Sequence, residues 1–276
     1  MTNTLKTIDK INVCIDYIKG FFEDTNGEKA IIGISGGKDS TVAAALCVQA
    51  LGKENVFGVL MPNGLTSGET AQDLEDGKEV CKILGIKYHI FDIHEAYNSL
   101  LFNVENLLYC QDSETENATA QTKINLAPRI RMSVLYAIAQ SMNGRVINTT
   151  NACERFVGYG TLFGDTVGDL ALLKNLTVSE IYEIGDALGL PYDLVHKTPA
   201  DGLTGKSDEE VLGVSYEDIE KYLTAERKSH LLKDEGYAFY QMKDEMNIDT
   251  FEKINELEYK SEFKRQIINV PGPEFN

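Results

Sequence analysis

The sequence predicts an α/β fold: a doubly wound, mostly parallel sheet with helices on both faces. Short apolar runs bounded by turn residues alternate along the chain with longer amphipathic segments, which is the pattern of a parallel sheet and its crossover helices. A glycine-rich turn also joins the first apolar run to an Ala-rich segment, a position where folds of this class place a ligand loop. We expect one domain over residues 1–276, with a helical, charged C-terminal segment from about residue 216.

The expected elements are assigned by the spacing of apolar residues. Strands are short apolar runs, expected at residues 30–34, 55–61, 87–93 and 145–148. Helices are expected at residues 3–20, 39–51, 68–84, 95–108 and 124–142. Residues 111–123 are polar without periodicity, so we expect a loop there, which together with residues 199–215 is a candidate for closing over a site.

Composition excludes several classes of function. The chain has 26 Lys and Arg against 43 Asp and Glu, so its formal charge is 26 − 43 = −17. Nucleic-acid binders usually carry a basic face, and no Lys/Arg run occurs here, so we expect no nucleic-acid partner; the acidity favours solubility. No apolar stretch is long enough to span a membrane.

The five cysteines give no metal or redox signature. None forms a C-x-x-C pair, so zinc-site and redox-motif spacing are both missing. Cys47 and Cys81 are expected to be buried thiols within helices. The odd number of cysteines and an N-terminus without an apolar signal segment predict a reduced, cytoplasmic setting.

The segment Gly33-Ile-Ser-Gly-Gly-Lys-Asp-Ser40 carries the chemistry. Its glycines let backbone N–H groups turn around an anion, and the hydroxyls of Ser35 and Ser40 can donate to it. The helix that begins near Asp39 directs its positive dipole end at the bound charge. The order of residues differs from the Walker A pattern, and the plain alternative is a tight turn that binds nothing.

An acid inside an anion-binding loop requires an explanation. Asp39 would repel phosphates unless a cation lay between them, which points to Mg²⁺ held by carboxylates and phosphate oxygens. The alternative is that Asp39 is a helix N-cap, a position that suits Asp.

The string Ser-Gly-Gly-x-Asp-Ser resembles the pyrophosphate loop of the N-type ATP pyrophosphatases, whose fold is adenine nucleotide α-hydrolase-like. Further segments, in order from about residue 31 to residue 265, resemble those of ammonia-dependent NAD synthetases. The segments are Asn125-Leu-Ala-Pro-Arg-Ile-Arg-Met132, Asn148-Thr-Thr-Asn-Ala-Cys-Glu154, Gly158-Tyr159 with Phe163-Gly-Asp165 and Asp169, His196 to Leu203, Ser207 to Tyr216, and Lys264-Arg265.

This resemblance implies a reaction. ATP activates the carboxylate of deamido-NAD as an acyl-adenylate, and ammonia then displaces AMP to give NAD. The length leaves no room for a glutaminase domain, so ammonia is expected to arrive free or from a separate protein. The family also implies a homodimer formed through helix 124–142.

The resemblance also implies roles for individual residues. It implies Mg²⁺ as cofactor held by Asp39 and Glu154, and catalytic roles for Asp39, Ser40 and Glu154. ATP binding is implied for Gly33, Ile34, Ser35, Gly36, Gly37, Lys38, Asp39, Ser40 and Thr149. Contact with deamido-NAD is implied for Arg129, Asp165, Asp169 and Lys264. Two plain alternatives stay open: Arg129 as an interface salt bridge, and Glu154 as a helix N-terminal acid.

Some positions depart from the family pattern. Leu162, Val178, Ala200 and Phe263 stand where the family carries Lys, Lys, Thr or Ser, and His, and an Arg and a Gln are missing near residues 60–64. Two rival hypotheses therefore remain: an ATP pyrophosphatase that amidates a different carboxylate, and a nucleotide-binding paralogue without activity. Retention of Asp39 and Glu154 together argues against the second.

Overall fold

Five parallel strands form the centre of the molecule. The computed structural model describes residues 6–64, 68–110, 118–197, 207–232 and 246–275. The strands are β1 (Lys29–Gly33), β2 (Val56–Leu60), β3 (Lys87–Ile90), β4 (Gly144–Asn148) and β5 (Leu170–Ala171). Their order across the sheet is β3-β2-β1-β4-β5, and every neighbouring pair is parallel. The predicted doubly wound α/β fold is therefore confirmed.

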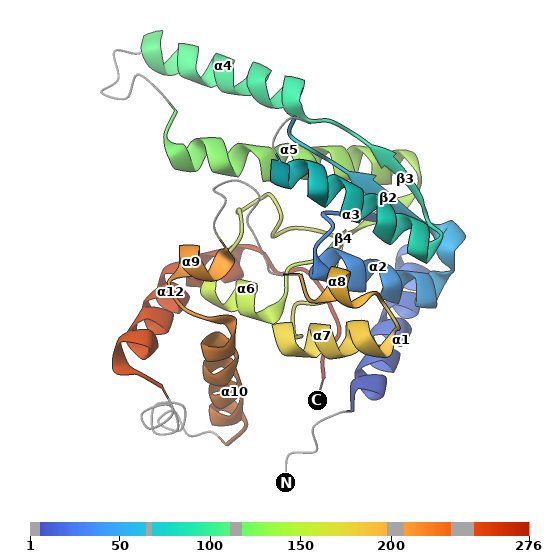
Figure 1. The fold of residues 1–276 in the computed structure, drawn as a ribbon, viewed down its shortest axis with the longest axis vertical. Helices are drawn as coiled ribbons and strands as arrows, with labels where there is room; N and C mark the ends of the chain where they lie inside the picture. The colour runs from blue at the N-terminus through green and yellow to red at the C-terminus, as the bar shows by residue number, and fades with distance from the viewer. Residues whose placement is uncertain (1–5, 65–67, 111–117, 198–206, 233–245, 276) are drawn as a thin grey trace.

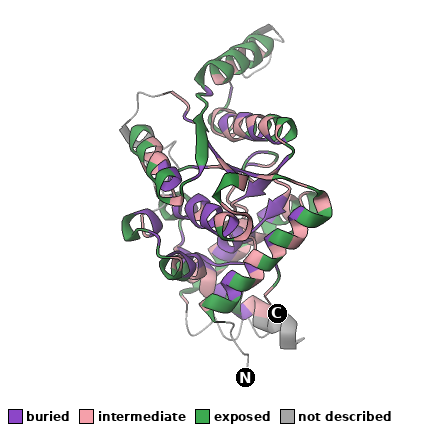
Figure 2. Ribbon diagram, turned by 90° about the vertical axis from the view of Figure 1, so that its right-hand side faces the viewer, coloured by how far each residue is buried: buried purple, intermediate pink, exposed green. Residues whose placement is uncertain are grey.

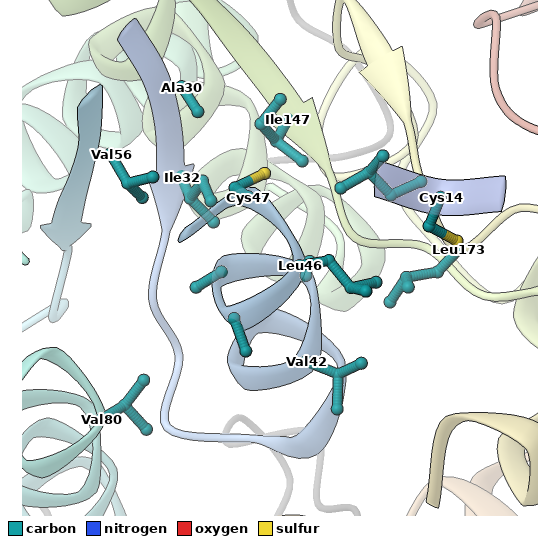
Figure 3. Close-up of a cluster of buried hydrophobic side chains, with 14 of the residues drawn as sticks. Cys14, Ala30, Ile32, Val42, Leu46, Cys47, Val56, Val80, Ile147 and Leu173 are labelled. Carbon is teal, nitrogen blue, oxygen red and sulfur yellow. The ribbon is translucent and has the colours of Figure 1, made fainter. Parts of the chain in front are cut away.

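Alternating side chains of β1 supply the cores on both faces of the sheet, as the twofold period of a strand requires. Ala30 and Ile32 belong to one buried cluster, and Ile31 belongs to another. The first cluster lies under α1 (Thr7–Thr25), α2 (Lys38–Leu51), α3 (Gly68–Leu84) and α7 (Val178–Ala187), and Figure 3 shows part of it. The second lies under α5 (Ala120–Ser141), against which α4 (His94–Cys110) packs. Both faces are thus covered by helices.

The strand order reverses direction at β1. The chain moves from β1 to β2 and β3 on one side, then returns to place β4 on the other side of β1. The loops that follow β1 and β4 therefore lead away from each other and leave a crevice between them. Open α/β sheets bind ligands in the crevice at such a switch point. The glycine-rich loop and the Asn148–Glu154 segment meet there.

A second helical cluster stands at the carboxyl edge of the sheet. It is built from α6 (Ala152–Val157), α9 (Asp208–Leu212), α10 (Tyr216–Leu232) and α12 (Ile248–Ile267), with its own buried apolar residues (Figure 1). Gly158 ends α6 with φ of 70°, and a Cβ there would lie 2.1 Å from the Cβ of Ser261 on α12. Only glycine fits both the left-handed backbone and this close approach. The packing of α6 against α12 therefore places the C-terminal helix α12 at the ligand crevice.

Several element boundaries differ from those expected. Helix α5 begins at Ala120, inside the expected loop 111–123, because Thr119 caps it by accepting from the Thr122 amide at 3.1 Å. Helix α2 begins at Lys38 with Gly37 as its N-cap, so the alternative of Asp39 as N-cap is wrong. Strand β5 was not anticipated, since two residues are too few for a periodic signal. Residues 111–117 and 198–206 of the two expected closing segments lie outside the described residues.

Other expectations are met. Cys47 and Cys81 are fully buried. None of the helices in the described ranges is long and apolar enough to cross a membrane. The two remaining short helices are η1 (Lys53–Asn55) and α8 (Tyr192–Val195).

Candidate active site

A cleft of about 710 Å³ opens at the switch point of the sheet. Ten of the residues that the sequence singled out line it, and they come from the loop after β1, the end of β4, α6, the segment after α6, and α12. They are Gly33, Ile34, Ser35, Gly37, Lys38, Asp39, Thr149, Glu154, Asp165 and Lys264. The fold thus assembles in one cleft most of the candidate residues that lie far apart in the chain.

Two residues of the glycine-rich loop, Ser40 and Gly36, fix its conformation without lining the cleft. The Ser40 hydroxyl is buried, donates to the Gly37 carbonyl at 3.1 Å and accepts from the Ser35 amide at 3.2 Å. Gly36 has φ of 84°, and a Cβ there would lie 2.6 Å from the backbone oxygen of Asp73 on α3. Ser40 and Gly36 hold the loop in shape, together with the Gly37 amide, which donates to the Ser35 hydroxyl at 3.2 Å. The N-terminus of α2, at Lys38 and Asp39, lines the cleft and is left to face an anion.

Asp39 and Glu154 approach each other at the centre of the cleft, bridged by Asn151 and Lys38. The Asn151 side chain donates to Asp39 Oδ1 at 3.3 Å, and its backbone amide donates to Glu154 Oε2 at 3.1 Å. Lys38 Nζ lies 3.0 Å from Asp39 Oδ2 and is buried. Asp39 follows β1 and Glu154 follows β4, so only the folded chain brings the two acids together.

The charges of this cluster perturb one another. Burial raises the pKa of Glu154 well above its ordinary value, and the Asp39 carboxylate raises it further, while Lys38 opposes both. Burial alone would lower the pKa of Lys38, but the carboxylates of Asp39 and Glu154 outweigh it and raise that pKa. A pair of acids held close together with only one cation is a site that a further cation would stabilise.

The donor set suits Mg²⁺ in company with phosphates. No group of three or more Asp, Glu, His or Cys side chains within the described ranges is arranged to hold a metal by itself. Two carboxylates beside an anion loop match the way Mg²⁺ binds, through one or two acids plus phosphate oxygens. The residues therefore fit Mg²⁺ delivered with a nucleotide. The plain alternative for Glu154 is also correct, because it is the N3 residue of a capping box on α6.

Asp208 is a further carboxylate that lines this cleft, and sequence reasoning missed it. It begins α9, is buried, and lines the cleft. Its two oxygens accept from Tyr159 at 3.0 Å and from Tyr216 at 3.1 Å. Lys38 Nζ lies 5.6 Å from the centre of the Tyr216 ring, which links this pair to the acidic centre. The Asp-Glu-Glu run of this segment reads as an ordinary helix start, so the sequence held no signal that this Asp turns inward.

Arg131 is a second residue that sequence reasoning missed. It lines the cleft from α5, and its Nε donates to the Met61 carbonyl at 2.9 Å. No described residue accepts a hydrogen bond from its two terminal nitrogens. Burial lowers its pKa, and the Asp165 carboxylate across the cleft opposes that shift. Pro128, Met132 and Leu135 line the same wall, so helical spacing from Pro128 was the signal that would have placed Arg131 there.

Asp165 and Lys264 both line the cleft, and their charges interact. Asp165 accepts from the Thr161 amide at 2.8 Å, and burial raises its pKa although that hydrogen bond and Lys264 oppose the shift. Lys264 donates to the carbonyls of Gly158 and Gly160 at 2.7 and 2.8 Å. A cation and an acid fixed by the backbone are suited to position a polar ligand.

Arg129 and Asp169 do not line the cleft. The Nε of Arg129 donates to the Leu162 carbonyl at 3.2 Å on an exposed surface. Asp169 Oδ2 accepts from the Val146 amide at 2.7 Å, where it joins β4 to the start of β5. Their roles in binding a substrate stay predictions.

The three described residues that depart from the family pattern have different surroundings in the structure. Val178 is buried in the C-terminal helical cluster, and Phe263 is half exposed on α12. The side chain of Leu162 does not line the cleft. Ala200 lies outside the described residues.

Together, the doubly wound sheet, the phosphate loop at its switch point and the paired acids define an α/β enzyme of the nucleotide-binding class. The comparisons with known proteins name the family. A sequence model described as NAD synthase matches residues 10–268, and the chain belongs to this family of ligases.

Relatives at 30% identity or more match nearly the full chain. The NH(3)-dependent NAD(+) synthetase of Methanocaldococcus jannaschii is 34% identical over 264 residues, which cover 95% of each chain. The enzyme of the same name from Thermococcus sibiricus is 35% identical and covers 98% of this chain and 97% of its own.

Solved structures agree with the fold. The NMN synthetase from Francisella tularensis superposes with a TM-score of 0.77 at 28% identity, covering 97% of this chain and 99% of its own. The NH3-dependent NAD synthetase from Campylobacter jejuni gives a TM-score of 0.75 at 27% identity, covering 97% and 100%.

Proposed function

We propose that this protein is an ammonia-dependent NAD synthetase. It would convert deamido-NAD to NAD with ATP and ammonia, through an acyl-adenylate, and release AMP and pyrophosphate. The observation that carries the proposal is the pairing of Asp39 and Glu154 beside the phosphate loop in a chain of the NAD synthase family. A loop for pyrophosphate and a pair of acids for a phosphate-bound cation are what transfer of AMP from ATP requires.

The residues of the chain divide the work by position. The phosphate loop at the N-terminus of α2 would receive the leaving pyrophosphate. Asp39 and Glu154 would hold Mg²⁺, which would neutralise charge on the phosphate oxygens. Arg131 and Lys264 are cations that line the same cleft, and they would contact the acid substrate. Helix α9 flanks the cleft and helps to keep water from the adenylate.

A pyridine mononucleotide acid is the second candidate substrate. The relative from Francisella tularensis is named an NMN synthetase, and its fold matches at a TM-score of 0.77. The chemistry at the carboxylate would be the same, so the two candidates differ only in the rest of the ligand.

The test is product formation by the purified protein with ATP, Mg²⁺ and ammonium. Deamido-NAD and nicotinate mononucleotide are supplied separately, AMP and pyrophosphate are quantified, and the amide product is identified by mass. We expect NAD to form with a higher kcat/KM than NMN. Faster NMN formation would reassign the substrate, and binding of ATP without any amide product would support the nucleotide-binding paralogue.

We also propose a homodimer, in which α4 takes a larger part than expected. Leu100, Phe102, Leu107 and Tyr109 of α4 are 48%, 63%, 60% and 71% exposed, and Figure 2 shows this helix exposed along its length at the top of the view. A run of large apolar side chains of this kind is characteristic of an interaction surface. Helix 124–142, the expected interface, is partly covered by α4 in one protomer.

The dimer proposal predicts that one charge on α4 disrupts the assembly. Phe102→Glu is expected to convert a dimer to a monomer in sedimentation velocity, because a carboxylate buried in an apolar interface costs several kcal/mol. The control is Tyr259→Glu, at a similarly exposed aromatic on α12. A wild-type protein that sediments as a monomer at micromolar concentration contradicts the proposal.

Arg131 is predicted to matter more than Arg129 within one protomer. Arg131→Met is expected to lower kcat/KM by about 10- to 100-fold, since a charge-assisted hydrogen bond is worth roughly 1.5–3 kcal/mol. Arg131→Lys should recover only part, because lysine lacks the planar fork. Arg129→Met is the matched control. A larger loss in Arg129→Met would show that the arginine facing away from this cleft is the one that binds substrate.

The remaining expectations stay predictions. They are a single domain over residues 1–276, a cytoplasmic location, ammonia supplied from outside the chain, and no nucleic-acid partner.

A further inference from the structure

A smaller cavity of about 50 Å³ adjoins the main cleft behind Glu154. The two share five lining residues, which are Asn148, Glu154, Gly158, Tyr159 and Lys264. Its outer wall is the C-terminal tail, through Ile268 and Val270. A volume of this size holds several waters, or one compact tetrahedral oxyanion.

Four cations line this small cavity: Arg155 from α6, Lys174 after β5, and Lys264 and Arg265 from α12. We call them the basic cluster. Glu154 is the one acid among the residues that line this cavity. In a chain with a formal charge of −17, a concentration of cations around one cavity is a local exception.

The members of the basic cluster differ in how far their charges are satisfied. Lys264 and Arg265 are held by backbone carbonyls, Lys264 by Gly158 and Gly160 and Arg265 by Phe156 and Glu258. Lys174 Nζ lies 3.5 Å from Glu274, whose side chain is 64% exposed. These three are fixed in place around the cavity.

Arg155 is the member without a partner. Its guanidinium makes no hydrogen bond or ion pair with any residue in the described ranges. Its side chain lines the cavity together with that of the like-charged Arg265. Two guanidinium groups turned toward one cavity repel each other unless an anion lies between them.

We propose that the basic cluster is a second anion subsite that takes a phosphate group, separate from the phosphate loop. Two sources share this chemistry: inorganic phosphate or pyrophosphate, and a phosphate of the dinucleotide substrate. Arg155 supplies the free donors, Lys174 supplies a second charge, and the tail closes the outer side. The dinucleotide source rests on the proposed function, whereas the inorganic source does not.

The proposed subsite includes a residue close in sequence to a position at which this chain lacks a cation that the family pattern carries. The cations that the family carries at the positions of Leu162 and Val178 are missing, and Lys174 stands one turn before Val178. The structure places Lys174 at the small cavity together with Arg155. The positive charges of Lys174 and Arg155 thus lie at the small cavity, which adjoins the cleft that holds Asp39 and Glu154.

Titration calorimetry of the full chain tests the subsite. The phosphate loop is first saturated with α,β-methylene-ATP and Mg²⁺, so that added inorganic phosphate or pyrophosphate reports on another site. We expect Arg155→Gln to weaken binding by at least about fivefold and Arg155→Lys to weaken it less, since a charged donor is kept.

Glu274→Gln is the matched variant with the opposite sign. Glu274 partly neutralises Lys174 and Arg155, so its removal is expected to tighten phosphate binding by about two- to fivefold. A purely structural role of these residues would not change affinity in opposite directions. Unfolding midpoints of the variants confirm that each is folded.

The outcomes separate the two sources. Opposite shifts for inorganic phosphate support a site for free phosphate. No effect on inorganic phosphate, with deamido-NAD binding weakened by Arg155→Gln and strengthened by Glu274→Gln, assigns the subsite to the dinucleotide. If neither ligand responds to either variant, the subsite is wrong. NAD formation by the wild type, measured on the same preparation, shows separately whether the proposed function holds.

Discussion

Asp39→Asn is expected to abolish amide formation. The variant keeps the size of the side chain and its contact with Asn151, but loses the charge that pairs with Lys38 at 3.0 Å and that would hold Mg²⁺. A metal ion stabilises transition-state charge by several kcal/mol, and about 4 kcal/mol corresponds to roughly a thousandfold in rate. We therefore expect AMP and pyrophosphate release to fall by about a thousandfold, with Mg²⁺ affinity in the presence of an ATP analogue reduced as well.

A matched control for Asp39 is available on α3. Asp73 also lines the cleft, but its carboxylate pairs with Lys197 at 2.7 Å and lies on the other side of the phosphate loop. Asp73→Asn should reduce the rate far less. Equal losses in the two variants would mean that the cleft needs negative charge in general and that Asp39 has no special role.

Glu154→Gln is expected to remove activity and to raise stability. Glutamine can still complete the capping box at the start of α6, so the local structure is kept. The charged Glu154 is disfavoured first by burial and then by Asp39, and the amide removes both penalties. Loss of a Mg²⁺ ligand should lower the rate about as much as Asp39→Asn does.

The sign of the pH dependence follows from the direction of the shift. The pKa of Glu154 is raised on folding, so the unfolded chain releases this proton first as the pH rises from about 4. Wild-type stability therefore falls with rising pH until the folded-state pKa is passed, and is then constant with respect to this group. Glu154→Gln lacks this contribution, so its advantage in unfolding midpoint should be small near pH 4 and grow toward neutral pH.

The control for stability is a glutamate at the same helix position. Glu180 completes the capping box of α7 in the same way, but it pairs with Lys10 at 2.6 Å. Glu180→Gln loses an ion pair and should be destabilised, in contrast to Glu154→Gln. Mg²⁺ with an ATP analogue should raise the midpoint of the wild type and leave Glu154→Gln nearly unchanged. An unfolding midpoint for Glu154→Gln below the wild type across this pH range would contradict the electrostatic account.

The class of the fold and the centre of the site can be predicted from residue order. Apolar runs and helical spacing are local properties, so the strands β1 to β4 and the helices that connect them were predictable from residue order alone. The glycine-rich loop and the resemblance to NAD synthetases single out Asp39 and Glu154. The short β5 and the ends of helices were missed, since a few residues carry no periodic signal and caps depend on single hydrogen bonds.

Which side chains line the cleft depends on how the elements pack against one another. Arg129 and Arg131 are two residues apart on α5, and the packing of that helix on the sheet turns Arg131 into the cleft and leaves Arg129 outside. Ser40 and Gly36 belong to the motif, but they fix the conformation of the loop and do not line the cleft. Asp208 lines the cleft from α9, whose sequence is that of an exposed helix. The gathering of Arg155, Lys174 and Arg265 is likewise invisible in the sequence. Residue order fixes the period of each element, but the direction of a side chain depends on the neighbours that element packs against.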